Sequence, residues 1–498
     1  MAPQAHFEAT RPNNTLLIAL FVVGFVVLRL GYVALTAPTR HLPGPWYTRF
    51  THYRLKRAVI SGQRVFYIDE LHKKYGPIVR LSPSEVGVSD LGAFKEIHKI
   101  GTKYLKSNWY QKLANFPKLG LFTMIEPREH GQRRKLLSRP FSRTYLVEHW
   151  EEVVREKALL CVEKIRDDAT RDTADVYNWW MLLASDVSAH LAFGESFGML
   201  ETGRANQWIR VLKKLTMGAG IMVEMPLLRL LRFIPITKVQ EVFNANEYIL
   251  QGAGRAVEMA RTRTGETNIF AKVIEDCEKE GEGHIDDMDV RIEAMNVIIA
   301  GTDTTGVTLT YLTWAVLQRP ELQVALEAEV AQLPKDFKEN DLMNLPLLNG
   351  VIEETLRLYG AAPSSLPRVV PNGGSKLGGQ YIPGGVTVCT QAYTFHRDAA
   401  IWTDPLTFNP YRWIGTKDTP AEAQSPDAKL AFHPFGVGSR SCVGIHLARM
   451  ELRYAVAFFF RECKGIKLGE KTTPESMEFE NFFLIAPKAH RCEVTIKR

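Results

Sequence analysis

The longest uninterrupted apolar run lies near the N-terminus. From Thr15 to Ala37 the chain is apolar except for Arg29. A membrane-spanning helix needs about 20 such residues, and a terminal arginine can reach the interface. A cleaved signal peptide is the weaker alternative, because Glu8 and Arg11 precede the run and no A-x-A site follows it. The pattern therefore predicts an uncleaved membrane anchor, with a short lumenal tail over residues 1–14.

The segment after this run indicates its orientation. Residues 38–60 contain no acidic residue and five basic ones, Arg40, Arg49, Arg54, Lys56 and Arg57. The positive-inside rule then places the rest of the chain in the cytosol. Within this segment, Leu42 to Trp46 reads Leu-Pro-Gly-Pro-Trp, which cannot continue a helix. Residues 38–47 are therefore predicted to form a stiff proline-rich hinge that sets the angle of the body, residues 48–498, to the bilayer.

Periodicity in the body predicts a mainly α fold with small β-sheets (α+β). Short strands are expected over Ile78–Leu81 and Glu85–Val88, which are separated by Ser-Pro-Ser. Apolar residues at three- and four-residue spacing indicate helix from about Arg143 to Leu191. A long helix is predicted from Asp287 to Gln318, where Arg-Pro stops it, and a last helix near Gly444–Phe460.

The stretch from Met225 to Ile236 has a different pattern. It alternates large apolar residues with Arg229 and Arg232. Two interpretations stay open. The stretch is either a buried helix end or a segment that dips into the membrane interface, with the arginines at the headgroups and the leucines in lipid.

Composition limits the classes of protein that fit. The chain has 498 residues, of which 45% are hydrophobic and 23% charged, as in ordinary globular proteins. Its net charge of +7 suits an anionic membrane surface or an acidic protein partner, but is too diffuse for nucleic acid. The six cysteines are far apart, so they do not form a disulfide framework, and a reduced, cytosol-facing environment is expected.

Two local patterns carry chemistry. In the middle of the long predicted helix, Ile298 to Gly306 contains two glycines, three threonines and an aspartate, which weaken a helix. Such a departure usually marks a functional site. The second pattern is the glycine-rich stretch Phe435–Gly444, which delivers Cys442 to the start of the last helix.

The cysteine stretch meets the needs of a thiolate-ligated haem. Its glycines, which permit tight turns and close packing, are Gly436, Gly438 and Gly444. A helix N-terminus and backbone N–H groups lower the pKa of a thiol, and Arg440 adds a cation that could pair with a haem propionate. An inert buried cysteine is one alternative. A zinc pair with His446 is another, weakened because no second Cys/His pair accompanies it.

All five fixed positions of F-x-x-G-x-R-x-C-x-G are present in this stretch. At this point the chain resembles the cytochrome P450 superfamily. In its overall sequence it looks like the members from filamentous fungi that act in secondary metabolism. The resemblance covers the whole body. Glu354 and Arg357 match the E-x-x-R of the family's K helix, where an arginine from a segment like residues 408–413 completes a buried triad. The resemblance implies the P450 fold and a haem-thiolate catalytic domain over residues 48–498.

The resemblance also implies a set of haem contacts. Residues 129–134 match the family's C helix, with His130 where W-x-x-x-R has its tryptophan and Arg134 as its arginine. Arg368 matches the arginine for the other propionate. The residues implied to bind haem b are His130, Arg134, Ala300, Gly301, Arg368, Phe435, Gly436, Arg440, Cys442 and Gly444, with Cys442 as the metal ligand.

Residues 300–305 match the family's oxygen-activating pattern [AG]-G-x-[DE]-T-[TS] without departure. The resemblance implies that Gly301, having no Cβ, leaves space for dioxygen. Asp303 and Thr304 are implied to be catalytic, passing protons toward the oxygen. Cys442 would favour O–O cleavage from the opposite face. Helix back-bonding is the alternative role for the threonines, but it does not explain the adjacent glycine and aspartate.

The chain shows no nucleotide-binding module, since no G-x-G-x-x-G follows a strand. The resemblance therefore implies that NADPH electrons arrive through a separate membrane-bound reductase, with a cytochrome b-type protein as a further donor. It also implies a single-pass protein of the endoplasmic reticulum membrane. Candidate pocket residues, mostly apolar or aromatic, are Trp109, Tyr110, Phe116, Phe122, Ala300, Ser365, Leu366 and Phe483.

The expected activity is a monooxygenase that hydroxylates, epoxidises or desaturates a lipophilic small molecule, in the style of fungal mycotoxin-type pathways. Two alternatives stay open. One is a haem-thiolate isomerase or dehydratase that does not use dioxygen, and the other is a non-catalytic haem sensor. The intact pair Asp303 and Thr304 argues against both.

Overall fold

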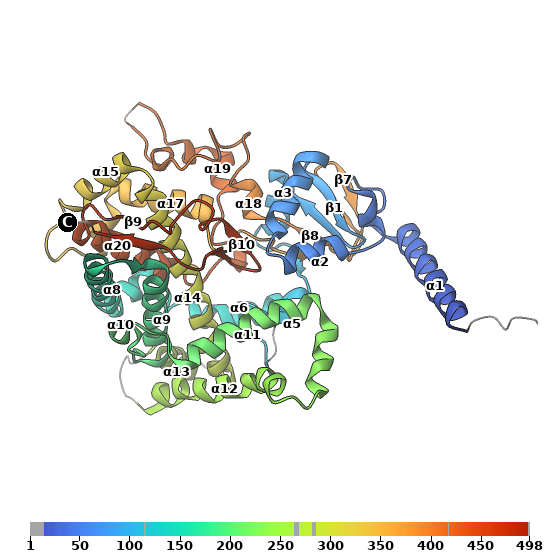
Figure 1. Cartoon of the computed structure of the whole chain (residues 1–498), viewed down its shortest axis with the longest axis horizontal. Helices are drawn as coiled ribbons and strands as arrows, with labels where there is room; N and C mark the ends of the chain where they lie inside the picture. The colour runs from blue at the N-terminus through green and yellow to red at the C-terminus, as the bar shows by residue number, and fades with distance from the viewer. Residues whose placement is uncertain (1–13, 114–115, 263–267, 281–284, 417, 497–498) are drawn as a thin grey trace, which may run out of the picture.

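The N-terminal helix α1 (Asn14–Thr36) stands clear of the rest of the molecule (Figure 1). The computed structural model describes residues 14–113, 116–262, 268–280, 285–416 and 418–496. The span Leu17–Thr36 is long and apolar enough to cross a membrane, and none of it is buried. The predicted apolar helix is therefore confirmed, whereas almost all of the predicted lumenal tail, residues 1–13, lies outside the described residues.

A lobe beside α1 contains the main β-sheet (Figure 1). The predicted strands are confirmed as the antiparallel pair β1 (Ile78–Ser82) and β2 (Glu85–Val88). The sheet continues in the order β1-β2-β8-β5-β3, with β8 (Thr387–Cys389), β5 (Arg368–Val369) and β3 (Leu105–Lys106). In the register of the last pair, Lys106 lies opposite Arg368.

The long helix α14 (Asp287–Leu317) runs through the helical body, and its ends confirm the prediction to within one residue. It begins at a capping box between Asp286 and Asp289, which satisfies backbone N–H groups of the first turn. It ends just before Arg319, the N-cap of the next helix, which starts at Pro320. A proline at the first position starts a helix readily but would break one already running.

Three further helices build the core with α14: α9 (Val176–Phe193) and α20 (Ile445–Glu462) pack against α14, and α8 (Glu151–Arg171) packs against α9 and α20. The helical pattern predicted over residues 143–191 is thus divided into α7 (Arg143–His149), α8 and α9. The short strand β4 (Ala174–Asp175) separates α8 from α9, because it pairs with the C-terminal strand β12 (Glu493–Thr495).

The structure decides between the two interpretations of the stretch that joins α11 (Gln207–Glu224) to α12 (Thr237–Thr262). Residues Pro226–Phe233 form the 3-10 helix η2, of which no residue is buried. Leu227 is 78% exposed and Phe233 68% exposed. The buried helix end is therefore wrong, and the exposed apolar surface favours a segment that contacts the membrane interface.

The other helices of the described chain are η1 (Trp46–Arg49), α2 (Tyr53–Ile60), α3 (Arg64–Tyr75), α4 (Leu91–His98), α5 (Trp109–Leu113), α6 (Pro127–Ser138), α10 (Met199–Thr202), α11 (Gln207–Glu224), α12 (Thr237–Thr262), α13 (Ile269–Glu280), α15 (Pro320–Val330), α16 (Glu339–Met343), α17 (Pro346–Tyr359), α18 (Ala392–Phe395), η3 (Pro410–Trp413), η4 (Glu422–Gln424), α19 (Pro426–Ala431) and η5 (Gly438–Arg440). Further short strands are β6 (Ser375–Leu377), β7 (Gln380–Ile382), β9 (Lys467–Leu468), β10 (Phe479–Asn481) and β11 (Ile485–Pro487).

Candidate active site

The glycine-rich loop before α20 presents Cys442 on a tight turn. The Cys442 N–H donates to the Phe435 carbonyl at 2.8 Å, and the Gly436 N–H donates to the His433 carbonyl at 3.0 Å. Gly436 and Gly438 have φ of 68° and 67°, which favour glycine. A Cβ on Gly438 would lie 2.3 Å from the His98 carbonyl oxygen. The glycines therefore let the loop turn sharply and pack against the end of α4.

Cys442 is exposed as a residue, but the protein atoms packed around its sulfur still remove water from it and shift the pKa of the thiol. Burial raises the pKa, while the Gly444 N–H and the charge of Arg134 lower it by less. The backbone N–H thus lowers the thiol pKa as expected, but desolvation outweighs both contributions. A bound metal cation reverses this balance and deprotonates a coordinating thiol.

Next to the loop, five basic side chains converge from separate parts of the chain. They are Lys106, His130, Arg134, Arg368 and Arg440. Arg134 donates to the Ser441 carbonyl at 2.6 Å and to the Ser441 hydroxyl at 3.1 Å. Arg440 donates to the carbonyls of Met124 and Ile125, both at 2.7 Å. The cluster includes all four basic residues that the sequence indicated, and Lys106, which it did not.

These five groups are close enough to repel one another. Burial, and then the charges of Arg440, Lys106, Arg134 and Arg368, lower the pKa of His130 to about 3. Burial and Arg368 lower the pKa of Arg440 to about 10, and burial, Arg440 and Arg368 lower that of Lys106 well below its usual value. The Arg368 Nε–H is buried without a partner among the described residues. This surplus of positive charge and this orphaned donor fit a dianionic ligand such as haem with its two propionates.

Four aromatic rings lie beside the basic cluster in a closed set of ring contacts. Trp109 contacts Tyr110 and Phe483, and Phe122 contacts the same two rings, at centroid distances of 5.2–5.9 Å. The Lys106 ammonium lies 4.3 Å from the Tyr110 centroid and 4.9 Å from that of Phe122. Four of the candidate pocket residues are thus brought together.

The glycine and threonine run in α14 behaves only partly as expected. The Thr304 hydroxyl donates to the Ala300 carbonyl at 2.6 Å, which is the back-bonding alternative. Asp303 is half-buried, and its charge adds to burial in raising the pKa of Tyr177 on α9. The reason given for Gly301 is wrong: a Cβ there would lie 2.1 Å from the Ser188 hydroxyl, so the missing side chain faces α9.

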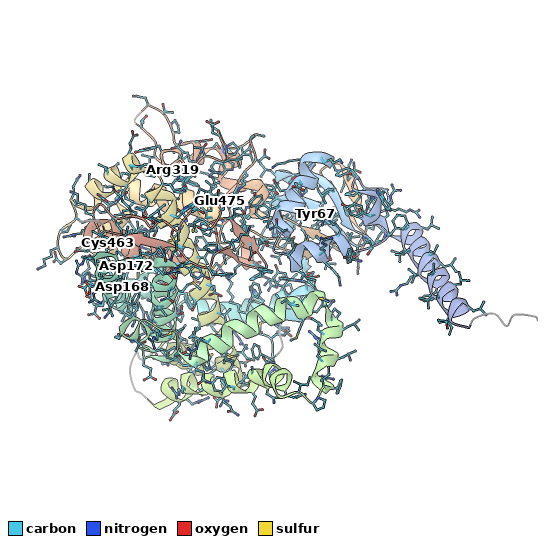
Figure 2. The ribbon with its side chains drawn as sticks, in the orientation of Figure 1. Tyr67, Asp168, Asp172, Arg319, Cys463 and Glu475 are labelled. Atoms are coloured by element: carbon cyan, nitrogen blue, oxygen red, sulfur yellow. The ribbon has the colours of Figure 1, made fainter. Side chains whose placement is uncertain are left out.

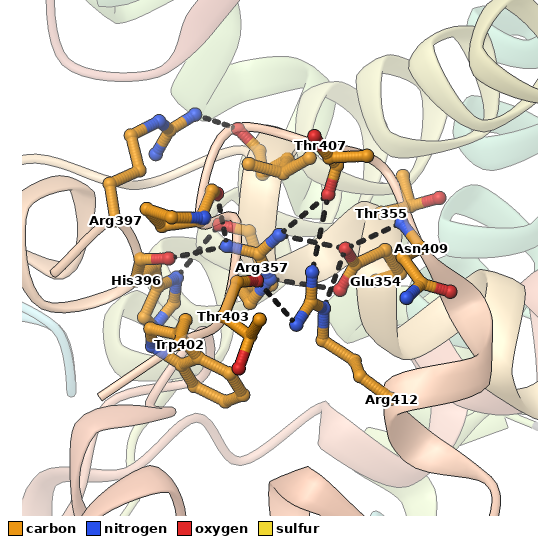
Figure 3. Close-up of polar contacts among 12 residues, drawn as sticks. Glu354, Thr355, Arg357, His396, Arg397, Trp402, Thr403, Thr407, Asn409 and Arg412 are labelled. Atoms are coloured by element: carbon orange, nitrogen blue, oxygen red, sulfur yellow. Dashed lines mark hydrogen bonds and ion pairs between the residues drawn. The ribbon is translucent and has the colours of Figure 1, made fainter. Parts of the chain in front are cut away.

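The predicted ion pair of α17 is confirmed, and Figure 3 shows the polar contacts around it. Glu354 accepts two hydrogen bonds from Arg357, at 2.7 and 2.8 Å, and one from Arg412 at 3.1 Å. Arg357 also donates to the carbonyls of His396 and Pro405. Burial acts to raise the pKa of Glu354, but the arginines hold it below its usual value. The triad ties α17 to the segment that leads toward the cysteine loop.

The structure does not support a zinc site at Cys442 and His446. Among the residues that the structure describes, no three His, Cys, Asp or Glu side chains gather in a group that could hold a metal ion. Cys442 and His446 therefore lack the further ligands that a closed zinc site requires.

Comparisons with known proteins agree with this geometry. The family model described as Cytochrome P450 matches residues 41–494. The chain is 38% identical to the cytochrome P450 monooxygenase cypX of Dothistroma septosporum, over 96% of each protein. It is also 38% identical to the monooxygenase stcB of Emericella nidulans, over 93% of this chain and 90% of that protein, and 36% identical to the monooxygenase aflV of Aspergillus parasiticus, over 94% of each.

The solved structure of the cytochrome P450DA haem domain superposes with a TM-score of 0.76, covering 92% of this chain and 97% of the other. At 17% identity, this likeness shows that the fold is shared.

Proposed function

Since this chain belongs to the cytochrome P450 family of monooxygenases, we propose that Cys442 would supply the thiolate ligand of haem b. Electrons from NADPH would reach the haem through a separate membrane-bound reductase. The observation that carries this proposal is the convergence of the cysteine loop and the five basic side chains. An accessible sulfur and a surplus of buried positive charge lie next to each other. A thiolate-ligated iron porphyrin with two carboxylates supplies what both lack.

The basic cluster holds and orients the cofactor in this proposal. Arg134, Arg368, Arg440 and Lys106 would donate to the propionates, and His130 would donate from its neutral ring. The position of Arg134 beside Cys442 lets one guanidinium stabilise both a carboxylate and the thiolate. When bound, the haem supplies the iron at which dioxygen is reduced and activated for oxidation of an unactivated carbon.

The residues of α14 handle protons. Because the Thr304 hydroxyl donates to the Ala300 carbonyl, its oxygen keeps lone pairs that can accept a hydrogen bond from a water. Asp303, one residue earlier, serves as the acid–base group that passes protons toward that position. The pair supports oxygen-dependent chemistry over an isomerase or dehydratase, neither of which needs protons delivered to oxygen.

We further propose a lipophilic, aromatic small molecule as substrate, in fungal secondary metabolism of the mycotoxin type. The four-ring cluster offers π-surfaces next to the cofactor position. The relatives reported above, which match over at least nine-tenths of their own length, come from the filamentous fungi Dothistroma septosporum, Emericella nidulans and Aspergillus parasiticus. The exposed helix α1 and the apolar surface of η2 support a single-pass anchor in the endoplasmic reticulum membrane, with the body on the cytosolic side.

The test is the carbon-monoxide difference spectrum of the reduced full-length protein, beside Cys442→Ser and the matched variant Cys463→Ser. A strongly red-shifted Soret band in the native protein and in Cys463→Ser, lost in Cys442→Ser, is expected. A stoichiometric haem with an unshifted band in folded native protein would contradict thiolate ligation by Cys442. Substrate-dependent NADPH consumption with a reductase then separates a monooxygenase from an isomerase or a sensor.

A further inference from the structure

One buried arginine holds the segment that joins the anchor to the body. We call residues 38–47 the strap. Arg80 lies in β1 and is 1% exposed. Its guanidinium donates to five backbone carbonyls of the strap at 2.6–3.4 Å. They belong to Thr39, Arg40, Leu42, Gly44 and Pro45.

The strap is tied to the sheet by other groups as well. The Arg80 backbone N–H donates to the Pro43 carbonyl at 2.7 Å. The Thr39 hydroxyl lies 3.1 and 3.0 Å from the carbonyls of Ser82 and Pro83. Gly44 has φ of 151°, and a Cβ there would lie 2.8 Å from the Arg80 carbonyl oxygen. The whole strap is therefore seated on β1, with Leu42 buried in the sheet's own core.

Hydrogen bonds also hold both ends of the strap. Just before its start, the Ala37 N–H donates to the Val33 carbonyl at 2.8 Å, which continues the helical hydrogen bonding of α1 up to the strap. At its end, Arg80 Nε donates to the Thr48 hydroxyl at 2.9 Å, inside η1. The neighbouring Tyr47 hydroxyl lies 3.4 Å from that of Tyr67, which Figure 2 shows in the lobe beside α1. No unsupported peptide separates the apolar helix from the body.

This arrangement is unusual for a buried charge. A buried arginine ordinarily needs a carboxylate, since an unpaired ion costs several kcal/mol. Here the partners of Arg80 in the described chain are carbonyl and hydroxyl oxygens. The acceptors are five carbonyls and the Thr48 hydroxyl. A guanidinium can reach these six oxygens because it presents five N–H groups in one rigid plane and can share one of them between two acceptors. A lysine ammonium, with three N–H groups, cannot.

We propose that Arg80 locks the strap into a rigid joint, which fixes the tilt of the catalytic body on the bilayer and holds the exposed face of Trp46 and η2 against the lipid surface. The inference rests on the proposed role of α1 as a membrane anchor. Trp46 is 75% exposed and sits at the end of the strap, where an aromatic ring suits the headgroup region. In Figure 1, α1 leaves the body from the same lobe as β1.

The experiment uses the full-length, haem-loaded protein in oriented phosphatidylcholine bilayers. The variants are Arg80→Lys, Arg80→Met and Thr39→Val, which weakens the strap independently of Arg80. Arg49→Met is the matched control, because Arg49 is exposed yet close enough to Arg80 to influence its pKa. Linear dichroism of the Soret band reports the haem tilt, and trypsin cleavage after Arg40 reports opening of the strap.

For all three test variants, we expect cleavage after Arg40 to be about tenfold faster and the distribution of haem tilt to broaden, with the carbon-monoxide spectrum unchanged. Arg49→Met should behave as the native protein. Native cleavage rates and an unchanged tilt in Arg80→Met and Arg80→Lys would overturn the rigid joint. Failure of the proposed function would appear separately, as native protein that lacks the red-shifted band or does not remain in the bilayer.

Discussion

Individual side chains in the basic cluster have unequal roles that the structure makes visible. Lys106 and Arg368 lie opposite each other in the register of β3 and β5, and both are buried. Neither has a carboxylate partner among the contacts described, and Lys106 donates to the Phe122 carbonyl. Two like charges held at adjacent strand positions are unfavourable unless an anion bridges them.

The first prediction follows from this pair. Arg368→Met and Lys106→Met should each accelerate haem loss to an excess of a haem scavenger by about 10- to 100-fold, the effect of losing one charged hydrogen bond. Lys103→Met, at an exposed position three residues before Lys106, is the control and should lose haem at the native rate. Equal retention in all three variants would mean that the cluster does not hold the propionates.

The sequence could indicate Arg134, Arg368 and Arg440 because each belongs to a motif with fixed spacing. Lys106 belongs to no such motif and resembles any lysine near a strand. Its role depends on the pairing of β3 with β5, whose residues are more than 250 positions apart, so no local pattern could reveal it. The same is true of Arg80, which reads as an ordinary strand residue until the strap is folded onto it.

At the scale of elements, the packing of α14 on α9 corrects the reading of the glycine run. Gly301 faces Ser188 and Gly306 faces Met181, so the two helices run antiparallel and approach closely at both glycines. A Cβ on Gly306 would lie 2.4 Å from the Met181 sulfur and 3.1 Å from its Cα. The two glycines of residues 298–306 therefore serve helix packing.

The second prediction tests this packing. Gly301→Ala should lower the free energy of unfolding by about 1–3 kcal/mol, because the new methyl group collides with the Ser188 hydroxyl. Adding Ser188→Ala should restore most of the midpoint of thermal unfolding and of the NADPH-dependent activity together. If stability returned but activity did not, the expectation that Gly301 makes room for dioxygen would be revived.

Element boundaries could be predicted where the signals are local. The ends of α14 follow from an aspartate cap and an Arg-Pro stop, both written in a few adjacent residues. The division of residues 143–191 could not be predicted in the same way. It depends on β4 pairing with β12, a strand more than 300 residues away, which interrupts an otherwise continuous apolar period.

At the scale of the whole molecule, three buried histidines connect the cysteine loop to distant elements. His433 donates its backbone N–H to His396 Nε2 at 3.1 Å, and His396 Nδ1 donates to the Arg357 carbonyl at 3.0 Å. His98 on α4 lies 2.8 Å from the Thr390 hydroxyl, and Phe94 packs against both His98 and His433. The His396 ring must be neutral, since its Nε2 accepts the hydrogen bond from the His433 N–H while its Nδ1 donates.

The last prediction follows from their pKa values. Burial lowers the pKa of all three histidines, and that of His433 falls to about 4. The unfolded chain has histidine pKa values near 6.5, so below that pH the unfolded state binds protons that the folded state does not. The stability contributed by neutral rings is therefore complete above about pH 6.5 and is lost as the pH falls toward 4. For His433, whose pKa is about 4, the loss at pH 5 is about 2 kcal/mol.

Urea unfolding of the full-length protein in detergent, followed by circular dichroism between pH 7.5 and 5, measures this loss. His433→Gln should reduce the loss of stability between pH 7.5 and 5 by about 2 kcal/mol, because it removes one buried neutral ring and leaves the other histidines with lowered pKa values in place. His490→Asn is the control: His490 is exposed with φ of 46°, a conformation that asparagine tolerates, and its replacement should leave the pH profile unchanged. An identical profile for His433→Gln would show that this ring does not link acidity to the stability of the cysteine loop.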